Sequence, residues 1–179
     1  MHGVSYGFYK EEIKQYLESK FEKDATILDV GAGSGTYLEL LKDYFKTIDG
    51  VEAFLPNIID NQLKERYHRI FHNDIKDLEY DYYDIIIFGD IIEHLEIEEA
   101  DKVLRYAFDR CKEMIVAVPY CYPQGIEYGN IYEIHKQDDL TKENMLERYP
   151  YLELLYGNDY YGYYIKKNPH HSIDIITYE

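Results

Sequence analysis

Three closely spaced glycines, Gly31, Gly33 and Gly35, stand in the stretch ILDVGAGSGTY, directly after the apolar segment 26–30. Because glycine has no Cβ, the backbone can turn sharply at these positions, and a ligand can lie directly against main-chain atoms. An apolar helical pattern follows the glycines, and the N-terminus of a helix carries a partial positive charge. The stretch therefore predicts a strand, a ligand-binding turn and a helix in succession.

The spacing of these glycines excludes two common nucleotide-binding patterns. The dinucleotide pattern G-x-G-x-x-G requires glycine at position 36, where this chain has Thr36. The P-loop pattern requires G-K-[ST], and this turn contains no lysine. The observed spacing, D-x-G-x-G-x-G from Asp29 to Gly35, fits neither of them. A glycine turn that serves only tight packing is the alternative to a binding turn.

The stretch resembles motif I of the class I S-adenosylmethionine-dependent methyltransferases. The resemblance implies an α/β fold with a doubly wound, mostly parallel seven-stranded sheet whose last strand is antiparallel. It also implies S-adenosylmethionine as the cofactor, with Asp29, Gly31 and Gly33 near its methionine part. The sequence also predicts a hairpin at 151–167, near the end of the chain. Such a closing hairpin is typical of this family and is not expected in a nicotinamide-dependent dehydrogenase.

The resemblance assigns further cofactor-binding residues at the ends of later strands. Glu52 in GVEAF stands 21 positions after Gly31, where the family has an acidic residue that accepts hydrogen bonds from the ribose hydroxyls. A carboxylate suits this task because it only accepts hydrogen bonds. Asp74 and Ile75 in HNDI correspond to the adenine site, and Asp90 ends the next strand. A surface glutamate at 52 and a turn cap at 74 are the alternatives.

Two segments indicate the class of methyl acceptor. The D-x-x-E-H-L sequence at 90–95 resembles the small-molecule branch of the family, including quinone-type methyltransferases. The PQG…GN-x-YE-x-H sequence at 123–135 resembles a subset of bacterial enzymes found with sugar and polysaccharide pathways. The resemblance implies a small polar substrate, a sugar or a nucleotide-linked sugar. A dehydrogenase and a non-catalytic binding module of the same fold are the alternative functions.

The chemistry of methyl transfer defines which residues are needed. The leaving thioether is neutral and needs no general acid, whereas a hydroxyl acceptor must lose a proton, for which histidine, with a pKa near ~6.5, is suited. His94 and His135 are the candidates, and we favour His135 as the base, with Glu93 or Glu133 orienting an imidazole. Loop histidines that only fix local hydrogen bonds are the alternative. No metal is predicted, although Asp90, Glu93 and His135 offer ligands for a divalent ion.

Alternating helical and strand-like apolar patterns predict the elements that position these residues. A β-α alternation of this kind predicts parallel strands joined by helical crossovers in a single domain, 1–179. The pattern does not decide whether 168–179 form a last strand. The expected helices are 10–22, 36–45, 57–67, 97–109 and 139–149, and the expected strands are 26–30, 47–54, 68–72, 83–90 and 114–119, followed by a loop at 120–137 and a hairpin at 151–167.

Composition limits the partners and the compartment. The formal net charge is −16, from 35 acidic and 19 basic side chains, and such a surface repels phosphate backbones, so nucleic acid is disfavoured as a substrate. No apolar stretch is long enough for a bilayer, and the N-terminus lacks the pattern of a secretion signal. Cys111 and Cys121 fit reduced thiols rather than a zinc site. We expect a cytoplasmic protein without a membrane segment.

Overall fold

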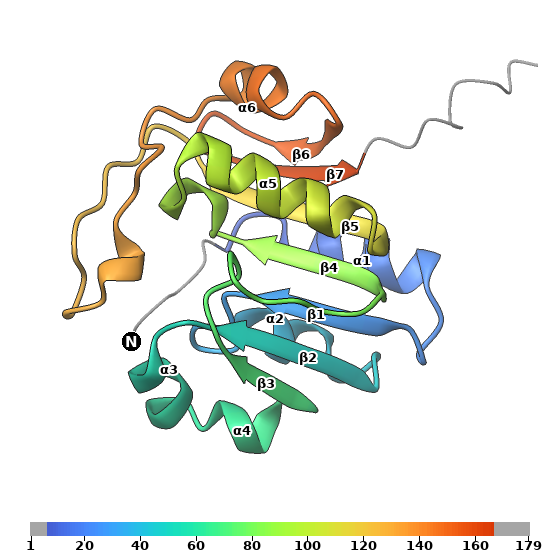
Figure 1. Cartoon of the computed structure of the whole chain (residues 1–179). Helices are drawn as coiled ribbons and strands as arrows, with labels where there is room; N and C mark the ends of the chain where they lie inside the picture. The colour runs from blue at the N-terminus through green and yellow to red at the C-terminus, as the bar shows by residue number, and fades with distance from the viewer. Residues whose placement is uncertain (1–6, 167–179) are drawn as a thin grey trace, which may run out of the picture.

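One mixed sheet organises the computed structural model, which describes residues 7–166 (Figure 1). Its seven strands follow the order β3-β2-β1-β4-β5-β7-β6, in which β7 runs antiparallel to both neighbours and the other pairs are parallel. This confirms the predicted α/β class and the antiparallel last strand. The strands are β1 (Thr26–Val30), β2 (Thr47–Glu52), β3 (Arg69–His72), β4 (Tyr83–Gly89), β5 (Cys111–Pro119), β6 (Leu152–Gly157) and β7 (Tyr161–Lys166). The undecided segment 168–179 lies outside the described residues.

Helices cover both faces of the sheet, which explains why the central strands are apolar throughout. Successive strand residues point to opposite faces, so Ile86 and Phe88 of β4 pack on one core and Ile85 and Ile87 on the other. One core includes α5 (Ile97–Phe108) and α6 (Lys142–Arg148), and the other includes α1 (Lys10–Lys20), α2 (Thr36–Leu41), α3 (Leu55–Asp60) and α4 (Leu63–Arg66).

Several element boundaries differ from those expected. The helix predicted at 57–67 is two short helices, because Gln62 adopts a left-handed backbone (φ 52°) between them. Pro56 lies in the first turn of α3, where its missing N–H costs no helical hydrogen bond. Strand β5 begins at Cys111, three residues earlier than the apolar run suggests, and the loop 120–137 contains the short 3₁₀ turn η2 (Ile131–Glu133).

The strand order fixes where a ligand can bind. It reverses direction between β1 and β4, and in open α/β sheets ligands bind at the carboxyl ends of the strands beside such a reversal. The glycine turn follows β1, the 3₁₀ turn η1 (Ile92–His94) follows β4, and the loop 120–137 follows β5. Among the described residues, no helix has both the length and the apolar character needed to cross a bilayer.

Candidate active site

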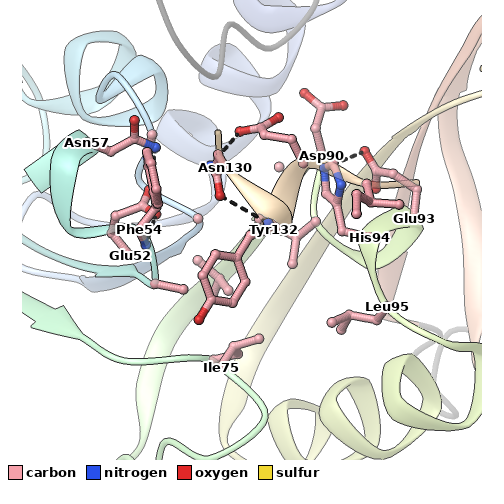
Figure 2. A pocket seen from close by; sticks show the side chains of 18 of the residues that line it. Glu52, Phe54, Asn57, Ile75, Asp90, Glu93, His94, Leu95, Asn130 and Tyr132 are labelled. Atoms are coloured by element: carbon pink, nitrogen blue, oxygen red, sulfur yellow. Dashed lines mark hydrogen bonds and ion pairs between the residues drawn. The ribbon is translucent and has the colours of Figure 1, made fainter. Parts of the chain in front are cut away.

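A cavity of about 630 Å³ opens at the carboxyl ends of β1, β2, β4 and β5. Figure 2 shows Glu52, Phe54 and Asn57 on one side of it, and Asp90, Glu93 and His94 on the other. All predicted site residues except Asp29 line this single cavity; they are Gly31, Gly33, Glu52, Asp74, Ile75, Asp90, Glu93, His94 and His135.

The turn between β1 and α2 has the backbone that only glycine adopts readily. Gly31, Gly33 and Gly35 have φ values of 78°, 52° and 82°. A Cβ on Gly31 would lie 1.9 Å from Cδ1 of Ile91, and one on Gly35 would lie 2.5 Å from the Arg66 guanidinium. Gly31 and Gly33 face the cavity, whereas Gly35 serves the packing of Arg66 against the turn.

Glu52 joins the end of β2 to the glycine turn. Its carboxylate is 6% exposed and accepts hydrogen bonds from the main-chain N–H groups of Gly33 and Phe54, each at 2.8 Å. The side-chain amide of Asn57 donates a longer bond, 3.4 Å, to the same oxygen that binds Gly33. The carboxylate is therefore fixed in the cavity wall by three donors, two of them from the backbone.

Asp29 lies beneath the glycine turn rather than in the cavity wall. It accepts a 2.5 Å hydrogen bond from the Tyr67 hydroxyl, and its burial raises the pKa of the carboxyl to about 6. The positive charge of Lys10 acts in the opposite direction and lowers the pKa of Asp29. Burial in turn lowers the pKa of Lys10 to about 8. Asp29 is thus a buried strand residue whose carboxyl group is bonded to Tyr67, without a surface on the cavity.

We expect Asp29→Asn to stabilise the protein near neutral pH. Because the pKa of Asp29 in the folded protein exceeds the usual aspartate value of 3.8, the stabilising contribution of Asp29 is complete below about pH 4 and is lost as pH rises through about 6. The loss is at most about 3 kcal/mol, and asparagine does not ionise. Denaturant unfolding at pH 4 and pH 7 measures it, with the exposed Asp43→Asn as control. An equal effect of Asp29→Asn at both pH values would contradict this account.

At the predicted adenine site, Asp74 and Ile75 lie side by side in the cavity wall. One oxygen of Asp74 accepts a 3.0 Å hydrogen bond from the N–H of Lys76, and the other lies 3.6 Å from the Lys76 ammonium. Asp74 therefore caps a turn, as the alternative proposed, while it also faces the cavity. Ile75 presents a nearly buried apolar surface against which a flat ring can pack.

The opposite wall begins where β4 ends. Asp90 has a left-handed backbone (φ 57°), and its carboxylate accepts a 2.5 Å hydrogen bond from the Tyr161 hydroxyl. Glu93 and His94 follow on η1, and burial raises the pKa of Glu93 well above its usual value. Burial lowers the pKa of His94 to about 4, and electrostatic repulsion from His135 acts in the same direction. This wall therefore holds a carboxyl group and a neutral imidazole, both shielded from solvent.

His135 reaches this wall from the loop after β5. Its Nδ1 lies 2.5 Å from the main-chain oxygen of Tyr122, and its ring meets that of His94 edge-on at 4.6 Å. Burial lowers the pKa of His135, so the neutral ring donates from Nδ1 and keeps a lone pair on Nε2. The carboxylate of Glu133 instead accepts from the side chains of Gln124 and Asn130, so a backbone oxygen orients the imidazole.

The family of the chain follows from a sequence comparison. A family model described as a methyltransferase domain matches residues 5–149, most of the chain. The chain belongs to this methyltransferase family. Together with the strand order, this makes it a class I S-adenosylmethionine-dependent methyltransferase. A search among curated proteins gives no significant match.

Solved structures share the fold of this methyltransferase at low sequence identity. An S-adenosylmethionine-dependent methyltransferase from Clostridium acetobutylicum ATCC 824 has a TM-score of 0.67 at 14% identity, covering 90% of this chain and 91% of that one. The 1,6-didemethyltoxoflavin-N1-methyltransferase of Burkholderia thailandensis, solved with its substrate and S-adenosylhomocysteine, gives 0.66 at 13%, covering 89% and 77%. Magnesium protoporphyrin IX methyltransferase from Synechocystis PCC 6803, with bound S-adenosylmethionine, gives 0.63 at 12%, covering 91% and 85%.

Sequence reasoning missed several residues of the methyltransferase cavity. Asn57 and Phe54, which hold Glu52, carry no motif of their own. Asn130 belongs to the GN pair in the 123–135 segment, and it accepts from the Tyr132 N–H and donates to Glu133, which shapes the loop. The GN pair was a visible signal for a loop-forming residue, whereas the contacts to Glu52 depend on the fold of α3.

Proposed function

We propose that this methyltransferase binds S-adenosylmethionine against Gly31, Gly33 and Glu52 and methylates a hydroxyl of a small polar metabolite, a sugar or a nucleotide-linked sugar. The observation that carries the proposal is the position of Glu52, a buried carboxylate held by backbone donors in the wall of the cavity beside the glycine turn. The other residues to which the proposal gives a role line the same cavity.

The donor side of the cavity suits an adenosyl group. A carboxylate has about four lone-pair positions, and its bonds to Gly33, Phe54 and Asn57 leave one acceptor position for a ribose hydroxyl. Because the backbone fixes the carboxylate, little side-chain freedom is lost when the ligand binds. In this proposal the ring packs on Ile75 and its amino group meets Asp74.

The acceptor side suits a polar molecule with a flat or ring-shaped body. Tyr122, Tyr128 and Tyr132 line the cavity, and each of the three is exposed. Their rings offer apolar faces and their hydroxyls offer hydrogen bonds, a combination that can stack on a sugar ring and bind its hydroxyl groups. The cavity volume also lies within the range of about 300–1,000 Å³ typical of small-molecule sites.

The residues of the chain have two tasks in the reaction. When bound, S-adenosylmethionine supplies an electrophilic methyl group on a sulfonium. The two walls must hold the acceptor oxygen in line with that methyl group, and this alignment can provide much of the rate enhancement. The second task is removal of the acceptor proton, and we assign it to the wall formed by Glu93, His94 and His135.

Calorimetric titration of the full chain with S-adenosylhomocysteine and, separately, with NADH tests the donor side. We expect saturable binding of S-adenosylhomocysteine and no binding of NADH; binding of NADH alone would overturn the proposal. Formation of S-adenosylhomocysteine from S-adenosylmethionine is then measured with free sugars, nucleotide-linked sugars and flat heteroaromatic amines as methyl acceptors. Turnover confined to the amines would show the acceptor class to be wrong, and cofactor binding without any turnover would favour a binding module.

A further inference from the structure

Three ligand-type side chains meet on the acceptor wall of the cavity. Glu93 and His94 come from η1 after β4, and His135 comes from the loop after β5. One potential ligand atom from each residue lies within 4.8 Å of the other two. Ligand atoms about 2.0–2.2 Å from one ion lie ~3.3–3.6 Å apart in a tetrahedral arrangement, so side-chain rotations that move the ligand atoms by about 1 Å bring the three into range.

The carboxylate of Glu93 is the observation that points to a ligand. The residue is 1% exposed, and neither of its oxygens has a hydrogen-bond partner among the described residues. Among the described residues, the one basic side-chain atom within 4 Å of the Glu93 carboxylate is Nε2 of His94, which lies 3.9 Å from one oxygen. Burying a carboxyl group without hydrogen bonds is costly, and a bound cation between Glu93 and the imidazoles removes that cost.

Of the two histidines, His135 has the hydrogen-bonded arrangement usual in a metal ligand, whereas Nδ1 of His94 has no hydrogen-bond partner among the described residues. The Nδ1 of His135 bonds to the main-chain oxygen of Tyr122, which fixes the ring and leaves Nε2 to face the cluster. A hydrogen bond from the non-ligating nitrogen to a carbonyl is the common support of a metal-bound imidazole. Nε2 of His94 lies 3.9 Å from a Glu93 oxygen, and we assign this nitrogen as the ligand atom of His94.

Neighbouring cations already have other partners. Lys76 and Lys136 line the cavity, but their ion pairs are with Glu99 and, respectively, Asp74 and Glu96. Asp90, considered from the sequence as a possible ligand, accepts instead from Tyr161 and is not a member of the three-residue cluster. Among the described residues, no lysine or arginine forms an ion pair with Glu93.

We propose that Glu93, His94 and His135 bind one divalent first-row transition-metal ion, and that its open side binds the hydroxyl of the methyl acceptor. Two imidazoles and one carboxylate leave coordination positions free and suit such ions better than Mg²⁺ or Ca²⁺. The proposal rests on the proposed methyl transfer for its acceptor only, and it makes His135 a ligand in place of a general base.

The reaction balances with the metal as a Lewis acid. The ion lowers the pKa of the bound hydroxyl, whose proton passes to solvent. The oxygen forms a bond to the methyl carbon as the carbon–sulfur bond breaks, and the electron pair of that bond remains on sulfur. The products are the methyl ether, S-adenosylhomocysteine and one proton, and the metal does not change its oxidation state.

Titration of the chelator-treated full chain with Co²⁺, followed by calorimetry and by visible absorption, tests the site. We expect one ion per chain and much weaker binding of Mg²⁺. Glu93→Gln, His94→Ala and His135→Ala should each weaken Co²⁺ binding at least 10-fold, whereas the exposed controls Glu98→Gln and His72→Ala should not. Equal binding by all variants, or no saturable binding to the wild type, overturns the proposal.

Two further measurements separate misfolding and failure of the proposed function from failure of the metal site. Thermal melting of each metal-free variant shows whether it folds, and Glu93→Gln should melt no lower than the wild type because it removes a buried carboxylate. Binding of S-adenosylhomocysteine to the metal-free wild type tests the proposed function alone. If that binding is normal while Co²⁺ does not bind, the metal proposal fails and the proposed function stands.

Discussion

Replacing Glu52 with glutamine is expected to weaken binding of S-adenosylhomocysteine about 10- to 100-fold. The carboxylate accepts from Gly33 and Phe54 in the protein and, in the proposed complex, from a ribose hydroxyl. A hydrogen bond to a charged group is worth about 1.5–3 kcal/mol, and the amide of glutamine cannot accept with its nitrogen. Calorimetry with S-adenosylhomocysteine measures the loss, and circular dichroism verifies that the variant is folded.

An analogue lacking the 2′-hydroxyl of the ribose shows whether the loss comes from the proposed contact. The wild type should bind this 2′-deoxy analogue more weakly than S-adenosylhomocysteine, whereas Glu52→Gln should discriminate much less between the two. Such non-additivity is the signature of two groups in direct contact. If the variant and the analogue reduce affinity additively, Glu52 does not bind the ribose. Asp60→Asn, an exposed carboxylate on α3, is the control and should leave both affinities unchanged.

The sheet could be predicted from the sequence because its determinants are local. The apolar run of β4 is buried on both faces and needs no knowledge of its neighbours to be recognised as a central strand. The boundaries of α3 and α4 could not be predicted, because the break at Gln62 lies inside a polar stretch with no glycine or proline at that position. Pro56 was visible, but its place in the first turn depends on where the chain leaves β2.

The candidate site also has a part that could be predicted from the sequence and a part that could not. The resemblance to the family's motifs implied Gly31, Gly33 and Glu52, and the three meet in one cavity because strand ends in a parallel sheet lie at one edge. The meeting of His94 with Glu93 and His135 depends on how the loop after β5 folds back, and Gln124 and Asn130 shape that loop through contacts with Glu133. The apolar periodicity that predicts helices and strands carries no information about such loop contacts. The buried position of Asp29 was equally hidden, since it depends on Tyr67, far along the chain.

Gly31→Ala is expected to destabilise the protein by about 2–5 kcal/mol and to reduce cofactor affinity in the same variant. Alanine at φ 78° costs about 1–2 kcal/mol, and overpacking costs about 1–3 kcal/mol more. The overpacking arises because the new Cβ would lie 1.9 Å from Cδ1 of Ile91, which must then move within the cavity wall. Denaturant unfolding and titration with S-adenosylhomocysteine measure the two effects. Gly125→Ala, where a Cβ meets nothing within 4 Å, is the matched control and should change neither.

Adding Ile91→Ala separates the two causes of that destabilisation. Truncating Ile91 removes the atoms that the new Cβ meets, so the double variant should regain the overpacking part but not the part due to the left-handed backbone. Unfolding free energies of the wild type, both single variants and the double variant give the interaction energy directly. A sum of the two single effects would mean that Ile91 already moves freely and that the turn requires glycine for its backbone alone. An interaction of 1 kcal/mol or more, about the lower end of the overpacking cost, would show that Ile91 and the glycine turn share one packed wall.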